Sequence, residues 1–451
     1  MSFHEIDSLI KAAEQGDAEA QNNLGLMYYI GEGVTQDHKE TFKWFKKAAE
    51  QSYAMAQFGL GFMYKHGEGV VQDYKEAIKW FKKAAEQGYA PAQNHLGFMY
   101  KYGEGVVQDY KEAIKWYKKA AEQGDAPAQS YLGLMYENGE GVVQDYKEAI
   151  KWYKKAAEQG DAMAQNNLGL MYDNGYGVVQ DYKEAIKWYK KAAEQGYAPA
   201  QSNLGLMYYN GQGVTQDYKE AIKWLKKAAE QGDATAQFGL GFMYHNGEGV
   251  VQDYKEAIKW YKKAAKQGDA SAQSNLGLMY KKGEGVVQDY KKAFKWYKKA
   301  AEQGDAFAQY SLGLMYYDGE GVVQDYKKVI KWFQKAAEQG YASAQYNLGF
   351  MYYNGEGVVQ DYKKAIKWYK KAAEQGYATA QYYLGFMYYY GYGVTQNYIE
   401  AYAWLSLASI KGDKDIIESR DLVAKKLSQE GLGKGQKRAK ELSSMIEQLK
   451  K

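Results

Sequence analysis

The chain has 451 residues, of which 46% are hydrophobic and 25% charged, and its formal net charge is +4. This apolar content is that of a folded protein and does not fit wholesale disorder. The absence of cysteine excludes disulfides, thiolate metal ligands and a cysteine nucleophile. No run of about 18 apolar residues occurs, so no membrane span is expected, and the polar N-terminus is unlike a secretory signal.

Basic and acidic residues are almost balanced along the chain. Residues 413–451 hold 10 Lys and Arg against 7 Asp and Glu, and residues 1–412 hold 49 against 48. Non-specific binding of nucleic acid depends on the neutralisation of phosphates. Nucleic acid is therefore not the expected partner, although a nucleic-acid-binding helical repeat protein stays open as an alternative because a local basic stripe is compatible with this balance.

One unit is repeated eleven times between residues 17 and 412. All 11 tryptophans belong to one series, which runs from Trp44 to Trp404 in steps of 36 residues. Periods of this length are typical of solenoids, in which each unit buries its apolar face against its neighbours. We number the positions of the unit from 1 at Asp17.

The elements are expected in a simple order. Residues 1–16 match the second half of the unit, with Ser8 in place of tryptophan, and predict an N-terminal capping helix, a half-repeat. Residues 17–412 predict eleven pairs of helices. Residues 413–451 no longer show the repeat and predict a C-terminal helical cap of two helices around Gly431, Gly433 and Gly435.

Residues 125–160 represent the unit. A first helix is predicted over AxAQxxLGxMY, where early proline is tolerated, and it ends at a glycine before the GxGVxQ linker. The second helix opens with a capping box, in which Asp145 accepts from an amide and Glu148 reaches back to the Asp145 N–H. In three repeats a lysine replaces this glutamate, so only half of the box is expected: Lys292, Lys328 and Lys364.

The motifs A-x-A-Q-x-x-L-G-x-M-Y, G-x-G-V and K-E-A-x-K-W-x-x-K-A-A-x-x-G resemble those of the Sel1-like repeat family, a relative of tetratricopeptide repeats. The resemblance covers residues 17–412, and the segment from Tyr402 to Leu422 is similar to the closing segment of bacterial members. It implies an all-α, right-handed superhelical α-solenoid that scaffolds protein–protein contacts, often in signalling or host interaction.

One face of the first helix varies between repeats. Positions 3, 6, 7, 13 and 14 change freely, and they span a sector of about 120° on a helical wheel. In tetratricopeptide-like superhelices the first helix lines the concave groove, so by analogy we place a partner-binding groove here. The last three repeats carry aromatic residues along this face, and these are the predicted partner-binding residues: Tyr310, Tyr317, Tyr346, Phe350, Tyr353, Tyr382, Phe386, Tyr389, Tyr390 and Tyr392.

Three features of the repeat allow more than one interpretation. The aromatic stripe is either functional or a by-product of a Tyr-rich repeat, since the chain has 47 tyrosines. Charged residues at position 13, among them Lys65, Lys101, Glu137 and Lys281, are interpreted as solvated fillers, with tuning of the groove charge as the alternative. The lysines of the second helices are interpreted as a solvated outer face, with contact to lipid or nucleic acid as the alternative.

No motif for catalysis or for metal binding is found. The chain has no GxSxG elbow, P-loop or HExxH motif, and its 5 histidines share no recurring position. We therefore expect no enzyme, no catalytic residue, no cofactor and no metal. The sequence predicts a non-catalytic scaffold or adaptor that binds a protein or peptide in its groove, with a regulatory subunit of a bound enzyme as a further alternative.

The expected location is the cytoplasm, with export into a host cell by a specialised system left open. The sequence also leaves open the identity of the partner and the oligomeric state.

Overall fold

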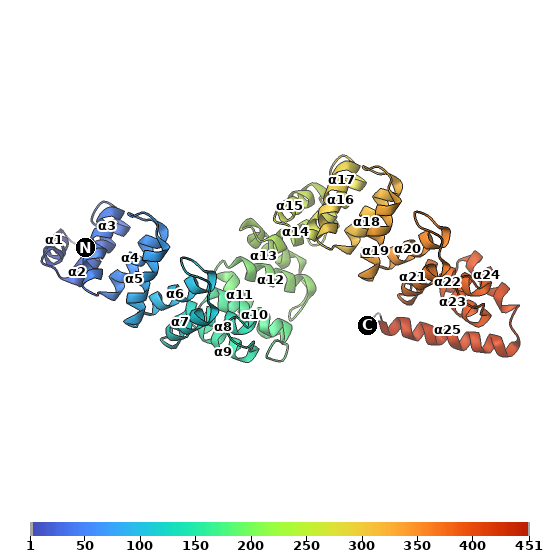
Figure 1. The fold of residues 1–451 in the computed structure, drawn as a ribbon, viewed down its shortest axis with the longest axis horizontal. Helices are drawn as coiled ribbons and strands as arrows, with labels where there is room; N and C mark the ends of the chain where they lie inside the picture. Colours follow the sequence, from blue (N-terminus) through green and yellow to red (C-terminus); the bar gives the residue numbers. More distant parts are fainter. Residues whose placement is uncertain (1–2, 450–451) are drawn as a thin grey trace. The chain divides into compact units, whose positions relative to one another are not determined.

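The computed structural model describes residues 3–449, and every regular element in this range is a helix. The chain forms two compact units, Met1–Gln231 and Gly232–Lys451. Within each unit, helix pairs follow one another along the chain (Figure 1). The fold is an all-α solenoid of helix-turn-helix repeats, as predicted, and no helix within residues 3–449 is long and apolar enough to cross a bilayer.

The helices of the first unit begin with a single capping helix and continue as pairs. They are α1 (Phe3–Glu14), α2 (Ala18–Ile30), α3 (His38–Glu50), α4 (Ala54–His66), α5 (Tyr74–Glu86), α6 (Ala90–Tyr102), α7 (Tyr110–Glu122), α8 (Ala126–Asn138), α9 (Tyr146–Glu158), α10 (Ala162–Asn174), α11 (Tyr182–Glu194), α12 (Ala198–Asn210) and α13 (Tyr218–Glu230). Even-numbered helices from α2 to α22 are the first helices of repeats, and odd-numbered helices from α3 to α23 are the second helices.

The second unit has the same alternation and ends in two helices outside it. Its helices are α14 (Ala234–Asn246), α15 (Tyr254–Lys266), α16 (Ala270–Lys282), α17 (Tyr290–Glu302), α18 (Ala306–Asp318), α19 (Tyr326–Glu338), α20 (Ala342–Asn354), α21 (Tyr362–Glu374), α22 (Ala378–Tyr390), α23 (Tyr398–Ala408), η1 (Ser409–Lys411), α24 (Lys414–Ala424) and α25 (Gln429–Leu449).

The first helix of each repeat has sharp ends that its sequence explains. In α8 the Asp125 carboxylate accepts from the amide of Ala128 at 2.8 Å, and Pro127 lies in the first turn, where its missing N–H costs nothing. At the other end Gly139 has φ 71°, a left-handed conformation, and donates its N–H to the carbonyl of Met135.

The capping box of the second helix is only half as predicted. Asp145 accepts from the amide of Glu148 at 3.1 Å, but its own N–H donates to the carbonyl of Tyr136 at 2.9 Å. Because that N–H is already satisfied, Glu148 pairs with Lys151 instead, at 3.1 Å. Where lysine replaces the glutamate, it pairs with the capping aspartate: Lys292 with Asp289, Lys328 with Asp325 and Lys364 with Asp361.

The two helices of a repeat approach closely because position 9 is always glycine. A Cβ on Gly133 of α8 would lie 2.7 Å from Cδ1 of Tyr153 in α9, inside the van der Waals limit. The ring of Tyr153, at position 29, therefore lies flat on the first helix and is fully buried. Glycine at this position costs helix propensity, and the close packing of the ring offsets that cost.

Successive repeats are joined by the tryptophan at position 28 and by the linker. Trp152 lies in one buried cluster with Leu132 and Met135 of its own repeat and with Tyr117 of the preceding repeat, so the core runs on from repeat to repeat. In the linker Gly141 has φ +75°, and a Cβ there would lie 2.6 Å from the carbonyl oxygen of Tyr110. Glycine is therefore required here for both conformation and space.

The C-terminal helices differ from the prediction in one respect. Gly431, Gly433 and Gly435 do not separate two helices but lie inside α25, and the break falls between Ala424 and Gln429. At Gly435 the reason is packing, because an added Cβ would lie 2.8 Å from Cδ1 of Tyr402. The helix α25 thereby packs closely on α23.

Substitution of Gly133 by alanine should destabilise the protein. The added methyl group forces the Tyr153 ring out of place, and overpacking of this kind costs about 1–3 kcal/mol. The midpoint of urea unfolding, followed by circular dichroism, should fall accordingly. Gly433→Ala is the matched control, because nothing lies within 4 Å of its Cβ direction and alanine is the better helix former, so its midpoint should stay unchanged or rise.

Candidate functional site

The predicted aromatic residues lie on one face of the first helices α18, α20 and α22 and in the linker after α22. We call this surface, which includes Tyr383, the aromatic face. Tyr390 has half of its surface exposed, and the other nine predicted residues are partly exposed. None is fully buried, so each side chain keeps part of its surface exposed.

Tyr310 contributes more to packing than to the surface. Its ring stacks on Phe333 at 5.5 Å between centroids and lies 5.1 Å from Tyr341. Its hydroxyl accepts from Nδ2 of Asn347 at 3.1 Å. Burial raises the pKa of Tyr310, and the bond from Asn347 opposes that shift. We therefore assign Tyr310 to the packing that supports the aromatic face.

The centre of the aromatic face is Tyr383, which sequence reasoning missed. Its ring stacks on Tyr369 of the core at 5.3 Å, and it lies 5.9 Å from Tyr346, 6.3 Å from Phe350 and 6.2 Å from Tyr353. Position 7 is otherwise small or polar in most repeats, so a tyrosine there was the available signal.

The C-terminal part of the aromatic face is partly covered. Tyr390 and Tyr392 stack at 5.6 Å, and Phe386 lies 4.4 Å from Tyr390. Tyr382 and Tyr389, by contrast, pack against the cluster around Val423 of α24. The C-terminal cap therefore limits the accessible part of this end.

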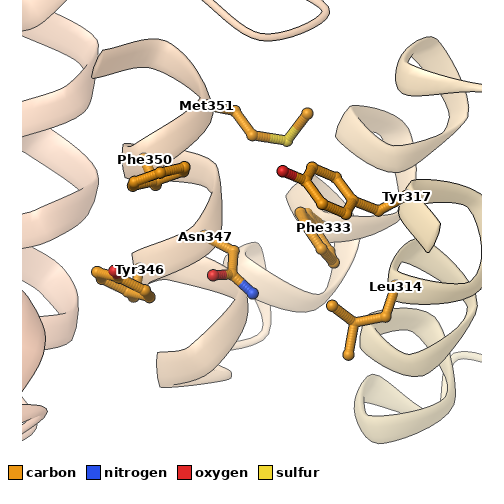
Figure 2. Close-up of a pocket in the computed structure, with 7 residues that line it drawn as sticks. All are labelled: Leu314, Tyr317, Phe333, Tyr346, Asn347, Phe350 and Met351. Carbon is orange, nitrogen blue, oxygen red and sulfur yellow. The ribbon is translucent and has the colours of Figure 1, made fainter. Parts of the chain in front are cut away.

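A hollow opens in the aromatic face between α18 and α20. It measures about 170 Å³ and is lined by Leu314, Tyr317, Phe333, Tyr346, Asn347, Phe350 and Met351. Figure 2 shows Leu314 and Tyr317 on one side, the residues of α20 on the other, and Phe333 between them. We call this hollow the unit-2 socket.

The residue at position 29 explains why this hollow exists. Most repeats have tyrosine there, and its hydroxyl reaches across the space between successive first helices. The hydroxyl of Tyr153 donates to Oε2 of Glu137 at 2.6 Å, and that of Tyr189 to Oδ2 of Asp173 at 3.1 Å. Phe333 has no hydroxyl, so the same space stays empty.

A second hollow lies at the corresponding repeat positions in the first unit, and sequence reasoning missed it. It measures about 320 Å³ and lies between α2 and α4, with Phe45 at position 29 and Gly59 at position 7. Met55 at its rim is 42% exposed. We call it the unit-1 socket. Both sockets share one sequence signal: phenylalanine at position 29 of one repeat, with a small or polar residue, Gly59 or Asn347, at position 7 of the next repeat.

Repeat two confirms the role of position 7. It also has phenylalanine at position 29, Phe81, but the ring of His95 lies 5.4 Å away and fills the space. His95 also contacts Phe58 at 5.1 Å, and burial lowers its pKa. A phenylalanine alone is therefore not sufficient to open a socket.

The charged residues at position 13 are bridges between repeats. Lys65 pairs with Glu104 at 3.0 Å, Lys101 with Glu140, and Lys281 with Glu320 at 2.9 Å, each time with the linker glutamate of the next repeat. The side chain of Lys101 is only 6% exposed. The interpretation as solvated fillers is therefore wrong for these lysines, because each forms an ion pair with the linker glutamate 39 residues further along the chain.

Acidic residues at position 13 follow the same logic. Glu137 and Asp173 accept from the tyrosine at position 29, and the next linkers carry Tyr176 and Gln212 where other repeats carry glutamate. A second carboxylate would repel the first. In this chain a lysine at position 13 is therefore followed by glutamate in the next linker, and an acidic residue at position 13 is followed by an uncharged one.

The lysines of the second helices are solvent-exposed, as predicted. Lys151 has 56% of its side chain exposed and pairs with Glu148. Lys155 places its ammonium 4.3 Å from the ring centroid of Trp152. In residues 3–449 no group of three His, Asp or Glu side chains is arranged to hold a metal ion.

These features define a class of protein, an α-solenoid of helical repeats with a partly exposed aromatic face on its first helices. The chain matches the Sel1 repeat over eleven adjoining segments from residue 18 to 413. The chain therefore belongs to the Sel1 repeat family, as the motifs predicted. Sel1 repeats mediate protein–protein interactions.

Two solved structures are similar over most of the chain. A protective antigen of uropathogenic Escherichia coli with an SLR fold is 41% identical, with a TM-score of 0.83, over 98% of this chain and 96% of that one. A Sel1 repeat protein from Oxalobacter formigenes is 37% identical, with a TM-score of 0.52, over 68% of this chain and 89% of that one. A search of curated proteins gives no match.

Reversal of the charge at Lys101 should destabilise the protein through its bridge. Lys101→Glu places two carboxylates together at a buried position, which should cost about 1–3 kcal/mol in urea unfolding. The double variant with Glu140→Lys restores opposite charges and should recover at least half of this loss. Lys154→Glu, on the exposed side of α9, is the control and should change stability by less than about 0.5 kcal/mol.

Proposed function

We propose that the protein is a non-catalytic scaffold that captures a segment of a partner protein on the aromatic face of the second unit. One apolar side chain of that segment occupies the unit-2 socket, and the surrounding rings contact the rest of it. The observation that carries this proposal is the open socket with aromatic walls, at a place where six of the eleven repeats have a tyrosine instead of Phe333.

The size of the socket supports a side chain as its occupant. At about 170 Å³ it is smaller than the roughly 300–1,000 Å³ of sites that enclose a small molecule. Pockets that take one anchoring side chain are the usual centres of protein–protein interfaces, and aromatic residues dominate them. The tyrosine rings around the socket combine a large apolar surface with a polar hydroxyl.

The two alternatives from the sequence have different support. A regulatory subunit would capture its enzyme by the same face, so that alternative is a special case of a scaffold. A nucleic-acid-binding repeat gains no support here, because α18, α20 and α22 contain neither lysine nor arginine and cannot neutralise phosphates.

Phe333→Tyr should abolish capture without disturbing the fold. Its hydroxyl would fill the unit-2 socket as it does in other repeats, and Asn347 at position 7 offers an acceptor, as Asn167 does to Tyr153. We expect peptides selected from a displayed random library on the intact chain to bind this variant at least about tenfold more weakly in fluorescence anisotropy.

The matched control is Phe45→Tyr, which fills the unit-1 socket and should leave the affinity of those peptides unchanged. Both variants should retain the far-ultraviolet circular dichroism of the parent chain. Equal affinity of the selected peptides for the parent chain and for Phe333→Tyr would show that the socket takes no part in binding.

A further inference from the structure

The aromatic face carries negative charge and no positive charge. The helices α18, α20 and α22 contain one charged residue between them, Asp318. The linkers after α18 and α20 add Glu320 and Glu356, and the linker after α22 has Tyr392 at the same position. Three repeats elsewhere in the chain place a lysine on the same face, at Lys65, Lys101 and Lys281, whereas the last three repeats have none there.

Two of the three carboxylates lie beside the unit-2 socket. Oε2 of Glu356 accepts from the hydroxyl of Tyr317, which lines the socket, at 3.1 Å. Asp318 follows Leu314, another lining residue, by one turn of α18 and so lies on the same side of the helix. The rim of the socket is therefore acidic on the side of α18.

These two groups have no ion-pair partner in the described part of the chain. Glu320 is paired with Lys281, at 2.9 Å, whereas no lysine or arginine within residues 3–449 forms an ion pair with Asp318 or Glu356. Burial, and then the repulsion of Glu320, raises the pKa of Asp318, and the positive charge of Lys281 opposes that shift. Burial and the carboxylate of Glu356 likewise raise the pKa of Tyr317.

The position that holds a cation in other repeats holds a ring here. Position 13 is lysine in α4, α6 and α16 and tyrosine in α18, α20 and α22, at Tyr317, Tyr353 and Tyr389. The face of a tyrosine ring attracts a cation within about 6 Å, and arginine makes such contacts most often. Rings and carboxylates on one surface thus offer two kinds of attraction to the same ligand group.

We infer that the segment captured by the second unit is a cationic peptide, in which a large apolar side chain enters the unit-2 socket and flanking arginine or lysine residues contact Asp318, Glu356 and the tyrosine rings. This inference rests on the proposed function and adds the chemistry of the partner. Complementary charge of this kind chiefly sets which segment binds and how fast, and it weakens with salt.

Short fluorescein-labelled Gly-Ser peptides test the inference directly. Each has a central leucine or phenylalanine, flanked on both sides by arginine, by glutamine or by glutamate. Anisotropy titrations with the full chain should show that the arginine peptide binds about three to ten times more tightly than the glutamine peptide, and that the glutamate peptide binds more weakly still. The advantage of arginine should shrink as salt is raised from 50 to 300 mM.

The double variant Asp318→Asn, Glu356→Gln supplies the decisive comparison. Both changes keep the size of the side chain, and glutamine can still accept from Tyr317. Arginine and glutamine peptides should bind this variant about equally. The variant Lys281→Gln, which leaves Asp318 and Glu356 in place, should keep the preference for arginine.

The outcomes separate this inference from the proposed function. If glutamine and arginine peptides bind the parent chain equally and Phe333→Tyr weakens both, the socket is real and the inference of a cationic partner is wrong. If no peptide binds, or if Phe333→Tyr binds all of them as the parent does, the proposed function fails and the inference fails with it. A preference for arginine that survives the double variant also overturns the inference.

Discussion

The structure depends on the contact between the glycine at position 9 and the side chain at position 29. In each repeat this contact brings two helices so close together that a single methyl group does not fit, as with Gly133 and Tyr153. The ring then becomes the centre of the repeat, against which the tryptophan of the next repeat packs. A single repeat cannot bury its apolar face alone. Stacked repeats are stable because each one completes the core of its neighbour.

The same side chain decides what the exposed face of the solenoid can do. With tyrosine at position 29, a hydroxyl occupies the gap beside the first helix, and in two repeats it donates to the acidic residue at position 13, as that of Tyr153 does to Glu137. With phenylalanine the gap stays open unless position 7 supplies a large side chain, as His95 does. A difference of one oxygen atom in the core thus separates a closed surface from the socket above Phe333.

Charge has two separate uses along the first helices. In three repeats a lysine at position 13 joins neighbouring repeats, as Lys101 does with Glu140, so its charge belongs to the fold. In the last three repeats this bridge is replaced by tyrosine contacts, which leaves Asp318 and Glu356 without a lysine or arginine partner in the described part of the chain.

Recurring residue types and their spacing specify the period, the helix pairs, the family and the face that varies, so these could be predicted from the sequence. Tertiary structure decided which side chains of that face meet. Tyr383, Phe333 and the bridge from Lys101 to Glu140 depend on contacts across repeats, 36 or more residues apart in the last case, and helical periodicity does not encode such distances. For the same reason the glycines of α25 predict a break between helices from the sequence, although Gly435 serves close packing on Tyr402. Local pattern specifies helices, whereas cavities and ion pairs arise only where separate helices come together.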